Sequence, residues 1–313
     1  MAAAATQRSQ ADSPFRIEAT GASYDPRTRI LKHGDTFAVL SAFGDMVGGV
    51  GCPDGLYHQD TCFLSQLELA LNGARPLADA EKLRQQFEAA FWCEELSTYA
   101  LALDGEKRPC RVIASNAGHA LLTGIAAPDR AERVAATLMG VGSFSGWGVR
   151  TVALTAARYN PISYHNGSVW PHDNALIALG LARYGLKEPA LGVFTGLFDA
   201  ASYWEPRRLP ELFCGFPRNR MAPTMYPVAC SPQAWASSTI FALIQASLGL
   251  HFDHRAGEIR FDRPRLPDFL ERLHVRGLRL GDAEVDVLFH RLDGEVAATV
   301  TRRRGALRVV VIH

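Results

Sequence analysis

The chain has 313 residues, with 33 basic and 32 acidic side chains and a formal net charge of +1. This balance gives no general attraction to nucleic acid or to a membrane surface, so we expect neither as a partner. The longest nearly apolar runs, such as residues 240–250, are too short to span a bilayer. The length allows one large domain or two ordinary ones, with a substantial core.

The cysteines are scattered and form no CxxC pair, which favours reduced thiols and a cytoplasmic location. The sequence also has no GxxxxGK[ST], HExxH or GxSxG motif, so it gives no grounds for a P-loop NTPase, a zincin or an α/β-hydrolase. The cysteines are Cys52, Cys62, Cys93, Cys110, Cys214 and Cys230.

The first part of the chain predicts a leader and then strands. Residues 1–27 are polar and lack the apolar segment of a signal peptide, so we expect a disordered leader. Residues 28–77 have strand-like runs, "TFAVL" and "QLELALNG", separated by turn pairs such as Gly34-Asp35 and Asn72-Gly73.

The periodicity then changes with almost no linker. "DAEKLRQQFEAAFW" places Leu83, Phe87 and Phe91 on one helical face, with Asp79 as the expected N-cap. Short β-like pieces follow in residues 98–126, around Asp104-Gly105. A long non-helical stretch runs from 140 to 168. Further helices are predicted at 128–139, 171–184, 189–203 and 232–248.

The tail, residues 251–313, returns to a strand pattern. Three alternating runs are separated by Asp293-Gly294 and Arg304-Gly305, which predicts hairpins on one small sheet. We interpret the arginine run 302–304 as a solvated turn rather than a nucleic-acid patch, because the overall charge is balanced.

The stretch "YHNGSVWPHDNA", residues 164–175, lies where a helix is predicted to begin. Pro171 suits the first helical position, and Asp173 would lie in the first turn, where it either satisfies the helix end or contacts a ligand. Tyr164 and Trp170 are either core aromatics or stacking platforms. Their neighbours carry amide and imidazole groups, a combination that suits a sugar. These neighbours are His165, Asn166 and His172.

A zinc site made by His165, His172 and Asp173 is an alternative for this stretch, but their spacing matches no metal motif. We therefore expect neither a metal nor an organic cofactor.

Two other loops carry candidate residues. Glu211 follows a proline among apolar residues, where a raised carboxyl pKa and an acid–base role are expected, unless the side chain simply points into solvent. Glu205 competes for the same role. "SFSGWGVRT", residues 143–151, adds Trp147 and Arg150 beside glycines that allow a ligand to approach the backbone.

These loops resemble the bacterial glycogen-debranching-enzyme-like proteins, the amylo-α-1,6-glucosidase family. The similarity is carried by "GWGVRT", "YNPISYHNGSVWPHDNALIALGLARYG", "LPELFCGF" and "CSPQAWA". The head, "LKHGDTFAVL…GLYHQDTCFLSQLELALNG", resembles the N-terminal β-domain of the same proteins, so the resemblance covers residues 28–250.

The resemblance implies an (α/α)₆ toroid that hydrolyses α-glucosidic bonds, α-1,6-linked or related, with inversion and with Glu211 as general base. It also implies an oligosaccharide or glucan substrate. The implied sugar-contacting residues are Trp147, Asn160, His165, Asn166, Trp170, His172 and Gln233.

The chain departs from the family pattern in its length. The sequence predicts fewer than half of the helices of a closed toroid, and the β-domain pattern stops near residue 78, which indicates an internal deletion. The family's acid aspartate belongs to the missing half, and neither Asp60 nor Asp173 is a convincing substitute. Helix faces without partners would favour self-association.

The expected fold is therefore mainly α with β: a leader, part of a β-sandwich domain, the C-terminal half of an (α/α)₆ toroid and a small β tail. The expected boundaries are 1–27, 28–78, 79–250 and 251–313. A hydrolase is the leading functional hypothesis, and hydrolysis by this short chain is in doubt without the acid. The alternatives are a non-catalytic carbohydrate-binding remnant, a fragment without function and a metal-dependent hydrolase using His165 and His172.

Overall fold

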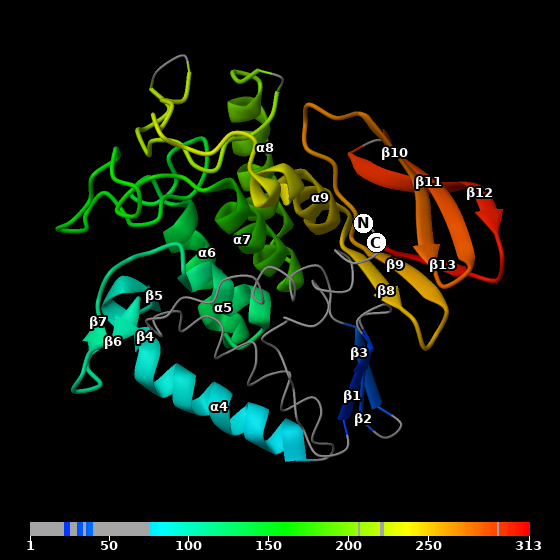
Figure 1. Ribbon diagram of the computed structural model, residues 1–313, viewed down its shortest axis with the longest axis horizontal. Helices are drawn as coiled ribbons and strands as arrows, with labels where there is room; N and C mark the ends of the chain where they lie inside the picture. Colours follow the sequence, from blue (N-terminus) through cyan, green and yellow to red (C-terminus); the bar gives the residue numbers. More distant parts are fainter. Residues whose placement is uncertain are drawn as a thin grey trace, which may run out of the picture. The chain divides into compact units, whose positions relative to one another are not determined.

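The computed structural model describes three strands between residues 22 and 39, and residues 75–313 apart from 206, 220, 221 and 293, with side chains from Ala80 onwards. Contacts divide the chain into two bodies, Met1–Gln85 and Gln86–His313. Within the described part, the protein is a mixed helix and sheet structure of small sheets and six α-helices (Figure 1).

The first body contains an antiparallel meander of β1 (Ala22–Asp25), β2 (Ile30–His33) and β3 (Thr36–Val39). β2 and β3 confirm the strand prediction at "LKHGDTFAVL". β1 lies within the predicted leader, so residues 22–25 are a strand and that part of the prediction is wrong. The strand prediction for "QLELALNG" lies outside the described residues.

The helix α4 (Arg75–Phe91) begins earlier than its periodicity predicted. Asp79 lies inside this helix and is not its N-cap, because the helical backbone already starts at Arg75. The expected boundary at 78/79 therefore falls within α4, and the contacts divide after Gln85. Two short hairpins follow, β4 (Trp92–Cys93) with β5 (Thr98–Tyr99) and β6 (Ala102–Leu103) with β7 (Pro109–Cys110).

Four of the later helices confirm their predictions to within a few residues. They are α6 (Pro128–Met139), α7 (Pro171–Arg183), α8 (Lys187–Ala201) and α9 (Ala234–Leu248). The central helix of this group is α7, which packs against α8, α9 and the short helix α5 (Ala117–Thr123). Ile177 and Leu181 of α7 are fully buried in this helical core.

The prediction missed α5, which was expected to be β-like. This helix is stabilised by close packing on α7 rather than by its own short sequence. A Cβ added to Gly180 would lie 2.6 Å from the Leu122 nitrogen, and one added to Gly118 would lie 2.5 Å from Ile177. Two glycines thus allow the two helices to approach closely, and Gly124 ends α5 in the left-handed conformation.

The tail forms two sheets around a shared hydrophobic core, in which Phe261 and Phe289 pack with their ring centroids 4.8 Å apart. The antiparallel sheet contains β10 (Arg272–Leu280), β11 (Ala283–Leu292) and β12 (Glu295–Arg304). The mixed sheet has the order β13–β9–β8, with β8 (Leu250–Asp253), β9 (Glu258–Asp262) and β13 (Arg308–Ile312).

One predicted hairpin of the tail is confirmed and the other is wrong. β11 and β12 pair as consecutive antiparallel strands, with Leu292 opposite Glu295. After Gly305 the chain leaves this sheet, and β13 pairs with β9 in parallel. The alternating pattern of β13 is the same for either partner, so the sequence could not distinguish a hairpin from a change of sheet.

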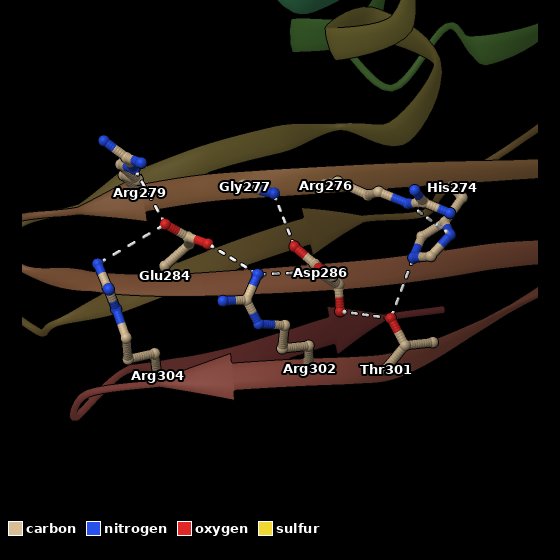
Figure 2. Close-up of polar contacts among 9 residues, drawn as sticks. All are labelled: His274, Arg276, Gly277, Arg279, Glu284, Asp286, Thr301, Arg302 and Arg304. Carbon is tan, nitrogen blue, oxygen red and sulfur yellow. Dashed lines mark hydrogen bonds and ion pairs between the residues drawn. The ribbon is translucent and has the colours of Figure 1, made fainter.

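The arginine run 302–304 is the end of β12 rather than a turn. Figure 2 shows the Glu284 carboxylate on the central strand β11 among three guanidinium groups, and the Asp286 carboxylate beside Arg302 and the Gly277 N–H. Glu284 pairs with Arg279 at 3.1 Å and with Arg302 at 3.2 Å, and Arg304 lies 3.8 Å away. The arginine side chains are more than half exposed, so each pair contributes little stability, but together they neutralise the carboxylates.

Glu88 of α4 joins three elements of the second body. Its Oε1 atom accepts hydrogen bonds from the Tyr99 hydroxyl at 2.7 Å and from the Ala127 N–H at 2.6 Å, at the start of α6. Arg130 in the first turn of α6 donates to its other oxygen. The carboxylate thereby satisfies a free N–H at the helix start and lies at the positive end of the helix dipole.

Glu88→Ala is expected to lower the free energy of unfolding by about 2 kcal/mol, because it leaves the Ala127 N–H and the Tyr99 hydroxyl without an acceptor. Urea denaturation followed by circular dichroism measures the change. Glu95→Ala is the matched control, since Glu95 forms an exposed pair with Arg111 and should change stability by less than about 1 kcal/mol. Equal effects of the two variants would contradict this role.

Lys187 at the start of α8 binds the C-terminal end of α9. Its ammonium group is buried and donates to the Ala246 carbonyl at 2.8 Å. Burial lowers the pKa of Lys187 from 10.5 to about 8, although the charge of Asp262 opposes this shift. Between about pH 8 and 10.5, the unfolded chain therefore binds more protons at this residue than the folded chain does.

Lys187 is expected to make the folded state relatively more stable as pH rises through this window, because the cost of burying its charge is removed. The comparison is between the native protein and Lys187→Met, which has no titrating group. Urea denaturation at several pH values across the window from about 8 to 10.5 should show the difference in stability moving in favour of the native protein. A difference independent of pH would be the contrary result.

Candidate functional site

Three loops meet at the start of α7. Val169 and Phe213 exchange backbone hydrogen bonds of 2.9 and 3.0 Å, Arg150 pairs with Val169, and Phe213 pairs with Met225. The loop before α7 therefore lies between the 143–151 loop and the 209–215 loop. These are the loops that the sequence singled out, and the structure brings them together.

Asn174 fixes the first turn of α7 to the 143–151 loop. Its Oδ1 accepts the Val149 N–H at 2.6 Å, and its Nδ2 donates to the carbonyls of Val149 and Trp170, each at 3.0 Å. The side chain is fully buried. One amide thus replaces a strand neighbour for Val149 and holds the loop against the helix.

Glu211 is 5% exposed, and both of its carboxylate oxygens accept hydrogen bonds. The Tyr164 hydroxyl donates to Oε1 at 2.7 Å, and the Cys230 N–H donates to Oε2 at 3.0 Å. Burial raises the pKa of this carboxyl, but these bonds, together with Gln233, outweigh burial and hold the pKa below its usual value. The expected raised pKa is therefore wrong, because the donors around Glu211 stabilise its charge.

Aromatic rings surround Tyr164, the donor to Glu211. The ring of Trp170 lies edge-on to Tyr164 with centroids 4.8 Å apart, and the Tyr226 ring lies at 5.7 Å. The Trp170 indole N–H donates to the Tyr164 carbonyl at 3.1 Å and to the Ser168 hydroxyl at 3.0 Å. Trp170 is 8% exposed, so most of its surface is already covered by protein.

Asp173 is buried and binds His119 of α5, with Nε2 and Oδ1 2.7 Å apart. This pairing corrects the interpretation that Asp173 satisfies its own helix end. Burial raises its pKa, but the bond to His119 and the charge of that residue, together with Ser115 and His172, more than offset this effect, so the pKa of Asp173 is lowered. The carboxylate is therefore ionised at neutral pH.

Three buried polar atoms near this helix end have no hydrogen-bond partner among the described residues: His172 Nδ1, Asp173 Oδ2 and the Trp235 indole nitrogen. The rings of His172 and Trp235 stack with centroids 4.6 Å apart. Burial lowers the pKa of His172 and so favours its neutral form. Native proteins rarely leave buried donors and acceptors unpaired, so this cluster indicates a place for a polar ligand or water.

Two of the expected ligand-contacting residues are structural. Trp147 is 2% exposed and lies in the helical core, with the Arg218 guanidinium 4.2 Å from its ring centroid. Arg150 is 1% exposed, and its Nε donates to the Gly215 carbonyl at 2.6 Å. Both side chains are therefore covered by protein groups.

The remaining candidates lie around the helix mouth. The His165 ring is exposed and stacks on Trp170 at 5.9 Å. Asn160 is exposed, and its backbone N–H donates to the Asn166 carbonyl at 2.7 Å. Gln233 lies just before α9 and hydrogen-bonds Glu211. Glu205 is exposed beyond the end of α8.

Sequence reasoning missed three contacts of the site: His119 with Asp173, Trp235 with His172, and Tyr164 with Glu211. The signal for Trp235 was present, because it belongs to "CSPQAWA". No local signal marked His119, since α5 itself was missed. Among the described residues, no three His, Cys, Asp or Glu side chains converge as metal ligands. No helix in the described part is long and apolar enough to cross a membrane.

Comparison with known proteins matches residues 31–120 to the family model for the N-terminal domain of (some) glycogen debranching enzymes. This match confirms the resemblance for the head of the chain. No curated protein sequence matches the chain.

Among solved structures, the chain is similar to the GH78 family rhamnosidase of a Bacillus species, with 17% identity, a TM-score of 0.54 and coverage of 80% of this chain and 25% of that one. It is similar to a sialidase with 13% identity, a TM-score of 0.54 and coverage of 72% and 22%. The GH63 mannosylglycerate hydrolase of Thermus thermophilus is 21% identical, with a TM-score of 0.40 and coverage of 51% and 36%.

The chain thus spans 36% of the Thermus protein and about a quarter or less of the two other proteins. At these identities, the TM-scores of 0.54 indicate a shared fold alone. In residues 31–120 the chain is similar to the N-terminal domain of some glycogen debranching enzymes, and its fold is that of part of much longer proteins.

Proposed function

We propose that this chain is a shortened glycoside hydrolase of the debranching-enzyme type and that Glu211 is its general base. The observation that carries the proposal is the buried Glu211 carboxylate, which hydrogen bonds keep ionised at the meeting point of the three loops. A general base must be unprotonated to accept a proton from water, and the lowered pKa of Glu211 meets this requirement.

The proposed architecture is the C-terminal half of an (α/α)₆ toroid, represented by α5 to α9, after part of a β-domain and before the two-sheet tail. The proposed boundaries are 1–27, 28–78, 79–250 and 251–313, with two exceptions: a strand lies at 22–25, and the boundary at 78/79 falls within α4. We attribute the missing half to an internal deletion near residue 78. Sequencing of the genomic DNA around codon 78 tests this attribution. A coding sequence that runs through codon 78 without interruption supports a real deletion, and an interrupted one contradicts it.

The proposed substrate is an α-linked glucan or a related oligosaccharide, bound at the mouth of α7. A sugar hydroxyl both donates and accepts, so it suits the three unpaired buried atoms, which include a donor (the Trp235 indole) and an acceptor (Asp173 Oδ2). The exposed ring of His165 on Trp170 offers a flat surface to a sugar, with Asn160, Asn166 and Gln233 around it. No metal or organic cofactor is part of this proposal.

Inverting hydrolysis also needs a carboxylic acid about 6.5 to 9.5 Å from the base, with water between the base and the sugar. Asp173 is the other buried carboxylate at the helix mouth, but its bond to His119 and its lowered pKa oppose proton donation. Turnover by this chain is therefore expected to be slow.

The loss of half a toroid also bears on assembly. Phe241 on α9 is 72% exposed and Phe198 on α8 is 45% exposed, and these rings offer apolar surface for self-association. We place the protein in the cytoplasm, in keeping with the free thiols of Cys93, Cys110, Cys214 and Cys230 among the described residues.

Glu211→Gln is expected to lower kcat for glucose release by roughly 10²- to 10⁴-fold, because an amide cannot accept the proton of the attacking water. Binding of maltooligosaccharides, measured by calorimetry, should be nearly unchanged. Glu205→Gln is the control in the exposed neighbouring segment and should keep the native rate. Unchanged turnover in Glu211→Gln would refute the assignment of the base.

Trp235→Phe is expected to weaken maltooligosaccharide binding roughly fivefold, or about 1 kcal/mol, because phenylalanine keeps most of the stacking on His172 but loses the unpaired N–H. Trp204→Phe is a matched control, since Trp204 packs on Phe213 and its substitution should leave the affinity unchanged. The same affinity in Trp235→Phe and the native protein would remove the indole from the binding site.

A second proposal is a carbohydrate-binding protein without turnover. It is favoured by the bond of Asp173 to His119, which opposes proton donation by the other buried carboxylate at the helix mouth. Calorimetry with maltooligosaccharides beside a glucose-release assay separates the outcomes: binding with turnover indicates the hydrolase, binding alone indicates the carbohydrate-binding protein, and neither indicates a fragment without either function.

A further inference from the structure

Glu211 is held from two sides by groups that are far apart in the sequence. The Tyr164 hydroxyl comes from the loop before α7, and the Cys230 N–H comes from the segment before α9. The Glu211 N–H also donates to the Cys230 carbonyl at 3.0 Å. The backbone of residue 230 thus fixes one side of the glutamate, and the Tyr164 side chain fixes the other.

Tyr164 is itself fixed in place. Its carbonyl accepts hydrogen bonds from the Ser168 hydroxyl at 2.7 Å and from the Trp170 indole at 3.1 Å. Its ring makes edge contacts with the rings of His165, at 4.6 Å, and Trp170, at 4.8 Å. The hydroxyl therefore has little freedom to turn away from Glu211. The contacts that fix Tyr164 at the start of α7 also fix the orientation of the Glu211 carboxylate.

We propose that Tyr164 is a positioning residue for Glu211: its hydroxyl holds the carboxylate in one orientation and in the ionised form, ready to accept a proton. The catalytic meaning of this assignment rests on the proposed function, whereas the link between the two side chains does not.

The chemistry of the contact explains how a donor helps a base without blocking it. A carboxylate has about four lone-pair positions, and the bond from Tyr164 occupies only one of them, on Oε1. This donor by itself therefore leaves the other positions of the carboxylate to its remaining partners and to water. Burial raises the pKa of the Tyr164 phenol, and the bond to Glu211 raises it further, so the phenol stays protonated and remains a donor.

Several other titratable groups lie near this pair. The ring of Tyr226 lies 5.7 Å from that of Tyr164. In addition to burial, the charge of Cys230 raises the pKa of Tyr164. Burial lowers the pKa of His172, and the negative charge of Glu211 opposes this shift, so the two groups are electrostatically linked. The experiment must therefore identify the Glu211 signal itself.

The test measures the pKa of Glu211 in the full chain by ¹³C NMR with glutamate labelled at Cδ. The signal that disappears in Glu211→Gln is assigned to Glu211. In Tyr164→Phe, which keeps the ring but removes the donor, the pKa of Glu211 should rise by about one pH unit. Tyr226→Phe is the matched control, because it removes a neighbouring hydroxyl and should leave the pKa of Glu211 unchanged.

Thermal unfolding of Tyr164→Phe establishes that the variant is folded before its titration is interpreted. If it unfolds, Tyr164→Leu provides a second replacement, whose side chain has no hydrogen-bond donor for Glu211. An unchanged pKa of Glu211 in a folded Tyr164 variant, or an equal shift in Tyr226→Phe, would overturn the proposal.

A kinetic arm separates this inference from the proposed function. If the native chain releases glucose, the acidic limb of its pH profile of kcat should lie at higher pH in Tyr164→Phe. The shift should equal the change in the pKa of Glu211 measured by NMR, and KM for maltooligosaccharides should be unchanged. If the native chain neither binds nor hydrolyses a glucan, the proposed function fails, and the NMR titration still decides the role of Tyr164.

Discussion

The candidate site depends on the Asn174 amide. Its hydrogen bonds to the N–H and the carbonyl of Val149 give a loop residue the pairing that a strand would otherwise provide. The next pairings, Arg150 with Val169 and Val169 with Phe213, extend this row toward Glu211. Without the amide, a buried donor and a buried acceptor of Val149 would be unpaired, and the row would lose its attachment to α7.

At Glu211, burial and hydrogen bonding act in opposite directions on the same carboxyl. Apolar surroundings alone would favour the neutral acid, which is the state that suits a proton donor. The Tyr164 and Cys230 donors, together with Gln233, reverse this preference and produce a carboxylate that suits a base. Whether this carboxyl suits a proton donor or a base is therefore decided by its hydrogen-bond partners and not by its burial.

The described part of the chain has two hydrophobic cores, one among the helices and one between the sheets of the tail. Lys187 lies where the two cores meet. Its ammonium group donates to a carbonyl in the last turn of α9, and the charge of Asp262 on β9 opposes the lowering of its pKa by burial. The helical core is organised around α7, whose contacts with α5, α8 and α9 bury its apolar residues. The same helix carries the polar residues of the site on its first turn, so the stability of the core and the geometry of the site are linked.

The sequence by itself determined most of the regular elements. Apolar periodicity and first-turn prolines located α6 and α7, and the alternating runs located the long strands of the tail, because these signals are local. The sequence also singled out the loops that carry Glu211, Trp170 and His172, through their unusual mixture of aromatic and polar residues.

Only the tertiary structure decided the pairings. It made α5 a helix, because close packing on Gly180 outweighs its short length, and it moved β13 from a hairpin to a parallel partner. It joined His119 to Asp173 and Tyr164 to Glu211, residues separated by 54 and 47 positions. The ionisation of a buried carboxyl depends on donors that the fold brings from a distance, and periodicity along the chain carries no information about them.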